Sequence, residues 1–220
     1  LSADNLKLAA VLAEQWGWHD RAILTVAQSK DYSDLNLRFP IDYENEVRNI
    51  AQQYKLEPAH VYAVIRQESA FDKDARSHAG ALGLMQLMPK TGQVTAKKNN
   101  IPLPSTGLLY EPDKNITIGS AYLKEVMDEY DDNIVLASAA YNAGPHRVER
   151  WLPKDEEKPA ARWIAMVPFN ETRNYIQRIL AYMAIYDWRL EQPATPIKKH
   201  MPDILPTNAY KAYEEQTGKR

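Results

Sequence analysis

The sequence predicts a mainly α-helical protein in which any sheet is at most a small β-hairpin. Apolar residues recur three and four positions apart along most of the 220-residue chain, which is the spacing of one helical face. No segment sustains the alternation of apolar and polar residues that a half-buried strand requires. Pro58 and Pro89 each stand where a helix should begin, at a first-turn position that needs no backbone N–H.

The N-terminal segment predicts two short helices broken at Trp16-Gly17-Trp18, with Asp20 as the N-cap of the second helix. A single helical hairpin cannot bury its apolar face alone. We therefore interpret residues 1–38 as the terminal hairpin and linker of an α-helical repeat region, with further repeats before Leu1. The linker is the stretch SKDYSDLNLRFP, which ends at Pro40.

Residues 39–190 form the predicted main domain, which is long enough to bury one good core. Its small hairpin is best placed within residues 75–87. Residues 191–220 form a polar, proline-containing tail that should pack on the surface or extend from it. The helices expected in the domain are 42–54, 58–70, 89–98, 115–130, 133–141, 145–151, 160–165 and 171–189.

Composition excludes several classes of function. The net charge is −2 and Lys and Arg are scattered, which argues against nucleic acid as a partner because phosphate binding needs a concentrated basic surface. The absence of cysteine excludes disulfides, thiol nucleophiles and zinc–thiolate sites. Five histidines without HxxxH or HxH spacing argue against a metal site, so neither a metal nor a cofactor is expected. Because the chain begins at Leu1 without a signal-type segment, we interpret it as a processed protein or a fragment.

Glu68 stands on a stripe of residues that should face the core. Val61, Val64 and Ile65 precede it at helical spacings, so the stripe ends in a carboxylate. No Lys or Arg lies three or four residues to either side, which removes the common local ion pair. A carboxyl group against apolar walls should have a raised pKa and stay protonated near neutrality, the condition for a general acid. The alternative is a slightly rotated helix that leaves Glu68 solvated or paired with a distant residue.

The segment after Glu68 is nearly free of large side chains. Residues 79–83 are Ala, Gly and Leu, which lets the backbone approach another group closely. Ser77 and Gln86 offer hydrogen bonds beside Met88. Small side chains, a few polar groups and flexible apolar side chains suit a groove that binds a sugar. An ordinary tight turn is the alternative.

Four motifs occur in order: RQESAFD…SHAGALGLMQLMP, EPDKNITIGSAYL, SAAYNAGPHRV and VPFNETRNYIQRIL. Together they resemble the soluble lytic transglycosylases, which are bacterial cell-wall enzymes with a goose-lysozyme-like domain. The resemblance covers about Phe39 to Leu190 and implies a lysozyme-like catalytic domain at 39–190. The N-terminal hairpin is similar to the end of the ring of helices that precedes this domain in larger family members.

The resemblance implies that Glu68 is the single catalytic acid and base. It would cleave the MurNAc-β-1,4-GlcNAc bond of peptidoglycan without water and leave 1,6-anhydro-MurNAc ends. Ordinary glycosidases use two carboxylates, so Asp72 and Asp74 are alternatives for a second acid. Asp72 would lie one turn beyond Glu68 if the helix continued. The family pattern gives neither a catalytic part, and we interpret both as loop and cap residues.

The resemblance also implies a set of substrate-binding residues. Ser77 would position the acetamido group or Glu68, and the Tyr141 hydroxyl would hold the carboxylate or the sugar, unless Tyr141 is a core aromatic. Glu171 would lie near the peptide-bearing side of the groove, or else be a helix N-terminal carboxylate favoured by the dipole. The motif residues Asn115, Gly119 and Tyr122 are interpreted as packing residues. The full expected set is Ser77, Gln86, Met88, Tyr141, Asn142, Glu171 and Tyr175.

Two other functions remain open from the sequence. One is a lysozyme-like peptidoglycan hydrolase, and the other is a non-catalytic glycan-binding or scaffold module. The resemblance implies peptidoglycan glycan strands and muropeptides as ligands, leaves cell-wall enzyme partners open, and is consistent with a monomer. It implies a periplasmic location, with attachment to the outer membrane through a segment absent from this chain left open.

Overall fold

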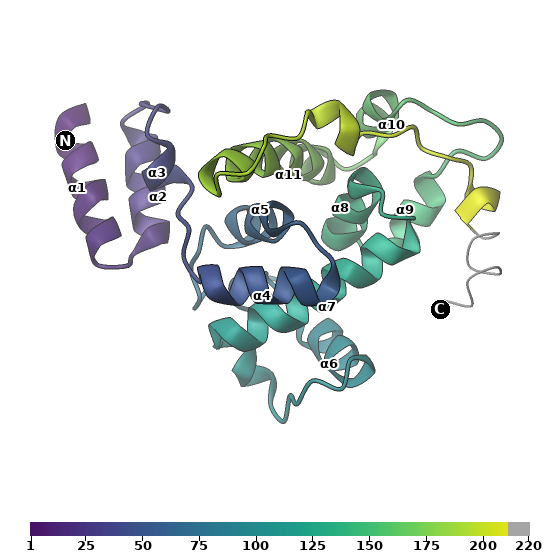
Figure 1. The fold of residues 1–220 in the computed structure, drawn as a ribbon, viewed down its shortest axis with the longest axis horizontal. Coiled ribbons are helices and arrows are strands. Elements are labelled where there is room, and N and C mark those ends of the chain that lie inside the picture. The colour runs from purple at the N-terminus through teal and green to yellow at the C-terminus, as the bar shows by residue number, and fades with distance from the viewer. Residues whose placement is uncertain (211–220) are drawn as a thin grey trace.

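The computed structural model describes residues 1–210 as a mainly helical body with a separate N-terminal hairpin (Figure 1). The last ten residues of the predicted tail lie outside this range. The elements are α1 (Ala3–Gln15), α2 (His19–Gln28), α3 (Leu35–Arg38), α4 (Glu44–Tyr54), α5 (Pro58–Glu68), α6 (Pro89–Lys98), η1 (Thr106–Tyr110), α7 (Pro112–Glu129), α8 (Ile134–Ala143), α9 (Pro145–Trp151), α10 (Ala160–Met166), α11 (Asn170–Arg189) and η2 (Ile197–His200).

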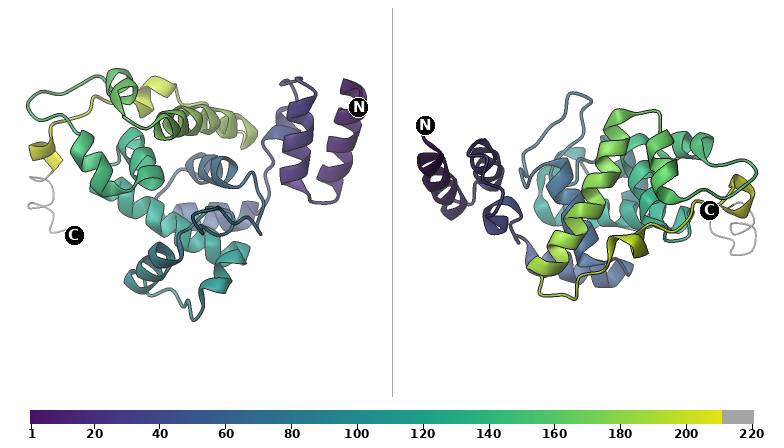
Figure 2. Two further views of the ribbon diagram at one scale, coloured as in Figure 1. Left: turned by 180° about the vertical axis from the view of Figure 1, so that it is seen from behind. Right: turned by 90° about the horizontal axis from the view of Figure 1, so that it is seen from above.

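The N-terminal hairpin packs α1 against α2 beside the body, and the three views of the ribbon agree on this placement (Figures 1 and 2). The chain reverses between the helices at Gly17, whose φ is +72°. The predicted break is therefore correct, but the predicted N-cap is wrong. Helix α2 begins at His19 with Trp18 as N-cap, which places Asp20 inside the first turn. The predicted linker also contains a short helix, α3, because the Asp34 side chain accepts from the N–H of Leu37 and caps it.

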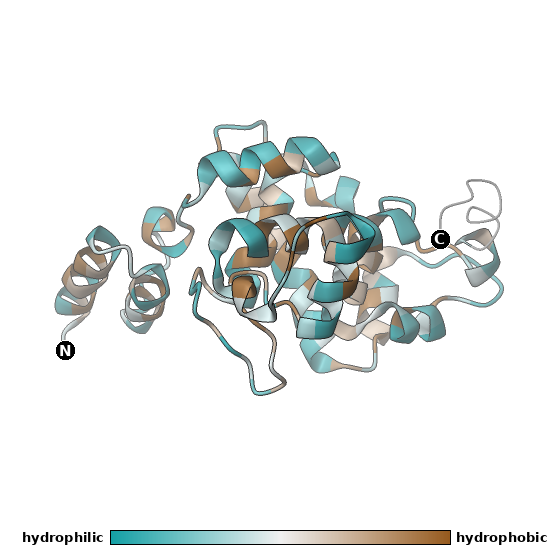
Figure 3. Cartoon of the chain, turned by 90° about the horizontal axis from the view of Figure 1, so that it is seen from below, coloured by the Kyte–Doolittle hydropathy of each residue, from teal (hydrophilic) through white to brown (hydrophobic). Residues whose placement is uncertain are grey.

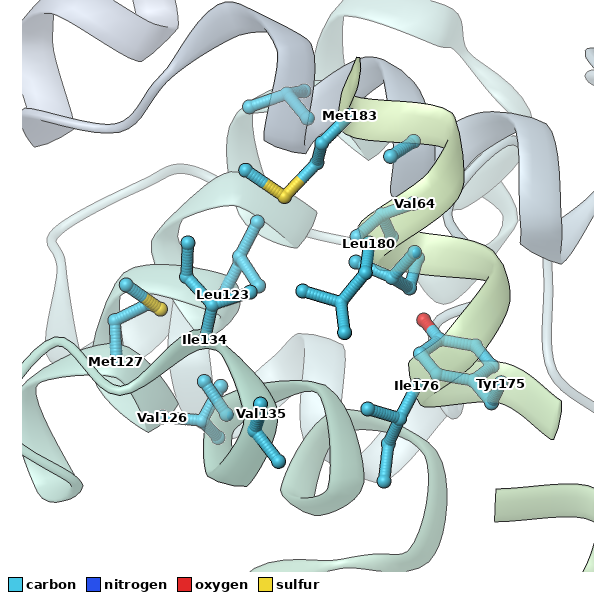
Figure 4. Packing of buried hydrophobic residues seen from close by; sticks show 14 of the residues in the cluster. Val64, Leu123, Val126, Met127, Ile134, Val135, Tyr175, Ile176, Leu180 and Met183 are labelled. Carbon is cyan, nitrogen blue, oxygen red and sulfur yellow. The ribbon is translucent and has the colours of Figure 1, made fainter. Parts of the chain in front are cut away.

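The core of the body forms where α5 and α11 lie side by side and α4, α7 and α8 close around them. Apolar residues of α11 meet Val64 of α5 and the inner faces of α7 and α8 in Figure 4. Figure 3 shows the same division, with hydrophobic segments gathered where helices meet and hydrophilic segments outside. Burial of these faces is the main stabilising contribution to the fold. The labelled residues of this cluster are Val64, Leu123, Val126, Met127, Ile134, Val135, Tyr175, Ile176, Leu180 and Met183.

A second, smaller cluster joins α6, η1 and the start of α7 to the loop that follows Glu68. Its buried members are Leu82, Leu87, Ala96, Leu109 and Ile118. The hairpin predicted within residues 75–87 is reduced to isolated bridges in that loop. The bridges pair Leu82 with Arg76 on one side and Leu87 on the other.

Asn115 fastens this loop to α7. Its side chain is fully buried, and its Oδ1 accepts from the N–H of Met85 at 2.7 Å. Its Nδ2 donates to the carbonyl oxygens of Leu82 and Leu109 at 2.9 and 2.6 Å. One amide therefore binds three backbone groups, and two of them, the N–H of Met85 and the carbonyl of Leu109, would otherwise be buried without a partner.

Several helix ends differ from the predicted ones for local reasons. Helix α5 ends at Glu68 and not at residue 70, because Ala70 and Phe71 adopt left-handed backbone angles (φ of 52° and 70°). Helix α4 begins at Glu44 because Tyr43 is also left-handed. Helix α7 begins at Pro112, ahead of the predicted start at 115, because proline fits the first turn.

The described part of the C-terminal tail packs on the body. After α11 it passes through η2 and pairs with the α9–α10 connection through an isolated bridge between Lys158 and Ile204. Ile204 is fully buried and Tyr210 nearly so. Across residues 1–210, none of the helices combines the length and the apolar character needed to cross a bilayer.

His19 joins the hairpin to the body. Its Nδ1 lies 2.8 Å from Oε2 of Glu14, and its Nε2 lies 3.1 Å from Oδ2 of Asp42. The hydrogen bond to Asp42 is the largest cause that raises the pKa of His19, to about 9, with Glu14 adding to it against the effect of burial. The imidazolium therefore persists near neutral pH and bridges two carboxylates on different parts of the chain.

We predict that this bridge stabilises the protein below about pH 6.5 and is lost as the pH rises through about 9, because the folded pKa lies above the ordinary value of 6.5. His19→Gln should lose about 1 kcal/mol of stability at pH 7, a value discounted for solvent screening. Thermal melts at pH 7 and pH 9.5 check this. Wild type should lose more stability over that interval than the variant, and His78→Gln, in an exposed loop, should behave as wild type. Equal losses in wild type and His19→Gln would refute the bridge.

Asn115→Ala should destabilise the protein by about 3 kcal/mol or more, because it leaves the buried N–H of Met85 and the buried carbonyl of Leu109 without partners. Urea denaturation measures the change. The matched control is Asn5→Ala on the exposed face of α1, where a change within about 0.5 kcal/mol is expected. Similar losses in both variants would contradict the fastening role.

Candidate active site

Glu68 is the last residue of α5, where the buried stripe of Val61, Val64 and Ile65 ends. Its side chain keeps some exposed surface, but the carboxyl is largely surrounded by protein. Burial is the main cause that raises its pKa, from 4.5 to about 7. The hydrogen bond from Tyr175 lowers the pKa, and the negative charge of Glu171 raises it. The raised pKa that the sequence predicted is therefore present in the structure.

A tight turn fixes Glu68 at the helix end. The Ser69 hydroxyl donates to the carbonyl of Ile65 and accepts from the N–H of Phe71. Ala70 and Phe71 take left-handed angles, a conformation that costs about 1–3 kcal/mol for such residues and persists only where its surroundings enforce it. The buried ring of Phe71 supplies that enforcement, because it packs in the main core.

Tyr175 holds the carboxyl from the opposite helix. Its ring is buried in the core on α11, and its hydroxyl donates to Oε1 of Glu68 at 2.8 Å. Figure 4 shows this ring at the edge of the core beside Ile176. The sequence interpretation gave this holding role to Tyr141. The Tyr141 hydroxyl instead donates to the carbonyl of Met85 at 2.9 Å.

The loop residues Ser77 and Gln86 are engaged within the loop itself. The Ser77 hydroxyl accepts from the N–H of Ala81 at 3.0 Å. The Gln86 amide donates to the carbonyl oxygens of Ala75 and Gly83 at 3.1 and 2.9 Å. Both side chains therefore form hydrogen bonds to the backbone of their own loop, which lies beside the end of α5. Met88, by contrast, is substantially exposed.

Two glycines allow this loop to lie against its neighbours. A Cβ at Gly83 would stand 2.3 Å from the carbonyl oxygen of Leu109, and the residue has φ of +72°. A Cβ at Gly119 of α7 would stand 2.4 Å from Sδ of Met85. Both positions therefore require glycine because backbone and side chains approach closely there.

Asn142 and Glu171 come together from α8 and α11. Asn142 Nδ2 donates to Oε1 of Glu171 at 3.4 Å, and Asn142 Oδ1 accepts from the Thr172 hydroxyl at 2.8 Å. Glu171 is exposed, and its charge acts on the pKa of Glu68. Thr172 was missed by the sequence analysis, although it stands in the quoted motif directly after Glu171.

Asp72 and Asp74 have local partners. Because α5 ends at Glu68, Asp72 does not occupy the next helical turn. Its Oδ1 accepts from the N–H of Asp74 at 3.0 Å. Asp74 is exposed and pairs with Lys73 at 2.8 Å. Both therefore serve the turn, as the sequence interpretation had it.

The arrangement provides one carboxyl group that can both give and take a proton near neutral pH. A second negative charge, Glu171, lies close enough to influence it. Among residues 1–210, no three His, Asp or Glu side chains are grouped as a metal ion would require. A cavity of about 260 Å³ lies elsewhere, at the N-terminal end of α5, and its lining does not include Glu68.

Comparison with known families matches three consecutive parts of the chain. Residues 45–164 match the Transglycosylase SLT domain. Residues 166–194 match the soluble lytic transglycosylase helical domain, and residues 1–35 match the soluble lytic murein transglycosylase L domain. The main-domain match runs from the first turn of α4 into α10 and includes Glu68.

Individual relatives agree with these matches. The soluble lytic murein transglycosylase of Escherichia coli K12 is 37% identical over 171 residues, which are 77% of this chain and 26% of that protein. A putative soluble lytic murein transglycosylase of Haemophilus influenzae is 37% identical over 183 residues, 83% of this chain and 31% of that protein. The chain thus spans about a third or less of the length of these relatives.

Solved structures give the same result. An inactive mutant of the lytic transglycosylase Slt from Pseudomonas aeruginosa superposes with a TM-score of 0.86 and 44% identity, over 90% of this chain and 32% of that one. The 70-kDa soluble lytic transglycosylase in complex with bulgecin A superposes with a TM-score of 0.84 and 31% identity, over 93% and 34%. These likenesses confirm the mainly α, lysozyme-like fold predicted from the sequence.

Removing the Tyr175 hydroxyl should raise the pKa of Glu68. A hydrogen bond to a charged group contributes about 1.5–3 kcal/mol, so Tyr175→Phe should shift that pKa upward by about one to two units. Carbon-13 NMR of the Glu68 carboxyl measures the titration directly. The matched control is Tyr141→Phe, which removes a buried hydroxyl bonded to Met85 and not to Glu68. An unchanged titration in Tyr175→Phe would show that the hydroxyl does not stabilise the carboxylate.

Proposed function

From the premise that the chain belongs to the Transglycosylase SLT domain family, we propose that it is a lytic transglycosylase. It cleaves the MurNAc-β-1,4-GlcNAc bond of peptidoglycan without water and leaves 1,6-anhydro-MurNAc ends. The observation that carries this proposal is the Glu68 carboxyl, whose pKa of about 7 suits both proton donation and proton acceptance.

Glu68 acts first as the acid. In its protonated form it gives its proton to the glycosidic oxygen, and the GlcNAc hydroxyl leaves as the bond to the anomeric carbon breaks. The carbonyl oxygen of the muramoyl 2-acetamido group stabilises the resulting sugar cation as an oxazolinium-like species. This step requires no second protein carboxylate, as in other substrate-assisted cleavages.

Glu68 then acts as the base. Its carboxylate takes the proton from the 6-hydroxyl of the same muramoyl sugar, and that oxygen bonds to the anomeric carbon as the acetamido oxygen leaves it and returns to a neutral carbonyl. The acid form of Glu68 is restored, so atoms and protons balance without water. Tyr175 supports this cycle because its hydroxyl donates to the carboxylate formed between the two steps.

The proposed substrate-binding residues fall into three groups according to the contacts they make. Met88 and Glu171 are exposed, and Asn142 lies at hydrogen-bond distance from Glu171, so these three suit direct contact with the glycan or its peptide. Ser77 and Gln86 hold the loop that the glycan lies against. Tyr141 and Tyr175 hold Met85 and Glu68 in place behind the sugar. This set is the one that the family resemblance implies, now divided by the contacts each residue makes.

A lysozyme-like hydrolase is the second candidate. It would need another carboxylate or a positioned water. Asp72 and Asp74 are engaged in their own turn, so Glu171, which acts on the pKa of Glu68, is the carboxylate that favours this alternative. A non-catalytic glycan-binding module is less well supported, because a scaffold gains nothing from a desolvated carboxyl group.

The proposed substrate places the protein at the cell wall, and therefore in the periplasm, as a monomer acting on glycan strands and muropeptides. Relatives named membrane-bound lytic murein transglycosylase C also match, at 32% identity over 60% of this chain. The same proposal includes attachment to the outer membrane through a segment outside this chain. It also includes partners among cell-wall enzymes.

Digestion of purified sacculi followed by mass spectrometry of the released muropeptides tests the proposal. We expect anhydromuramoyl ends, each lighter than a reducing end by one water. Glu68→Gln should lower turnover by about 10²–10⁴-fold or more, the range for losing a general acid–base group, while binding of sacculi persists. The matched control is Asp74→Asn, an exposed carboxylate of the neighbouring turn, which should retain activity.

Each alternative gives a different result in the same experiment. Reducing ends that disappear in Glu171→Gln would indicate hydrolysis with Glu171 as the second carboxylate. Binding of sacculi without any cleavage by wild type would overturn both enzyme readings.

A further inference from the structure

Residues 191–210 form a strap that crosses the body after α11 and returns toward the α9–α10 connection (Figure 2). Lys158 and Ile204 exchange backbone hydrogen bonds of 2.9 and 2.7 Å. The N–H of Thr207 donates to the carbonyl of Pro153, and the Tyr210 ring lies edge-on to Tyr130. The strap is thus held at its far end by backbone pairing and aromatic packing.

Nearer to α11, the N–H of Thr195 on the strap donates to Oδ2 of Asp187 at 3.0 Å, and two histidines then line a cavity under the strap. His200 of η2 and His60 of α5 line one cavity of about 260 Å³ and are 8% and 1% exposed. Within residues 1–210, neither Nε2 atom has a hydrogen-bond partner, and both atoms are buried. The floor of the cavity is apolar, formed by Leu56, Met127 and Ile134.

We propose that residues 191–210 are an acid-released strap, which closes over α5 only while the buried His60 is neutral. A buried imidazolium without an acceptor is strongly disfavoured, because it loses hydration and gains no compensating hydrogen bond. Opening the strap rehydrates His60 and removes this cost.

The charged groups around the pair leave His60 as the main carrier of the effect. Lys55 and Glu57 stand on the α4–α5 connection, Asp132 at the α7–α8 turn and Lys199 on the strap. From α11, Asp187 accepts from the N–H of Thr195 on the strap. Glu57 Oε2 lies 4.0 Å from Nε2 of His200. The lysines oppose a positive charge on His60.

The direction of the pH dependence follows from burial. Burial is the first cause, and His200 the second, that lower the pKa of His60 from 6.5 to about 4. Because the folded pKa lies below the ordinary one, the closed strap is fully favoured above about pH 6.5 and weakens as the pH falls toward 4. His19, with its raised pKa, stays protonated throughout this window and does not contribute.

The released state would expose the apolar cavity floor while leaving Glu68 in place. His60 and Glu68 lie at opposite ends of α5, eight residues or about 12 Å apart along the helix axis. The inference therefore concerns a surface distant from the proposed chemistry, and it does not rest on the proposed function.

Hydrogen exchange of the full chain, read by mass spectrometry on peptides from residues 191–210, tests the strap. The exchange rates are first corrected for the intrinsic effect of pH. The equilibrium constant for opening of the strap should then increase about 30-fold from pH 7.5 to pH 5, because the pKa of His60 is about 4 with the strap closed and 6.5 with it open. His60→Gln should reduce the increase to less than about 3-fold. His146→Gln, an exposed histidine on α9, should keep the full increase.

Two results would overturn the proposal: no increase in wild type, or the same increase in His60→Gln. If His60→Gln does not fold, NMR titration of the imidazole in wild type decides the question. A His60 ring that stays neutral down to about pH 5 in the closed protein supports the strap. A ring that titrates near 6.5 with the strap closed refutes it.

Discussion

The withdrawal of the Glu68 carboxyl from water is the constraint on which the rest of this structure depends. A pKa raised from 4.5 to about 7 corresponds to about 3 kcal/mol held against the ionised form. Above pH 4.5 this is a cost to the native state that grows until about pH 7, because the unfolded chain ionises freely. The α5–α11 core must offset that cost through apolar burial, and the same core positions Tyr175.

The loop after Glu68 shows how a segment with little regular structure can be fixed in place. It has isolated bridges where a hairpin was expected. Its order comes from side chains of distant helices: Asn115 binds its backbone from α7, and Tyr141 binds Met85 from α8. Gly119 and Gly83 permit the close approach. Buried side chain–backbone hydrogen bonds therefore replace strand pairing, which allows the loop to curve around the end of α5.

Much of this could be predicted from the sequence because the signals are local. Proline at first turns located α5 and α6, and the apolar stripe identified Glu68 as an unusual carboxylate. The misses are non-local or stereochemical. Tyr175 lies 107 residues from Glu68, so no spacing rule indicates which tyrosine reaches the carboxyl. The left-handed Ala70 and Phe71, which end α5 early, carry no glycine or asparagine signal. A motif match likewise does not indicate that Ser77 and Gln86 form hydrogen bonds within their own loop.

The position of Glu68 as the final residue of α5 has one more effect. The aligned peptide dipoles of a helix place a partial negative charge at its C-terminus, where the last carbonyl oxygens lack intrahelical partners. A carboxylate at that end faces a like field, whereas the same side chain in the first turn would be stabilised as an anion. Helix direction therefore favours the protonated form of Glu68, in addition to burial. A chain that presented this glutamate from the opposite end of a helix would have to oppose a dipole contribution of about 0.3–1 kcal/mol by burial alone.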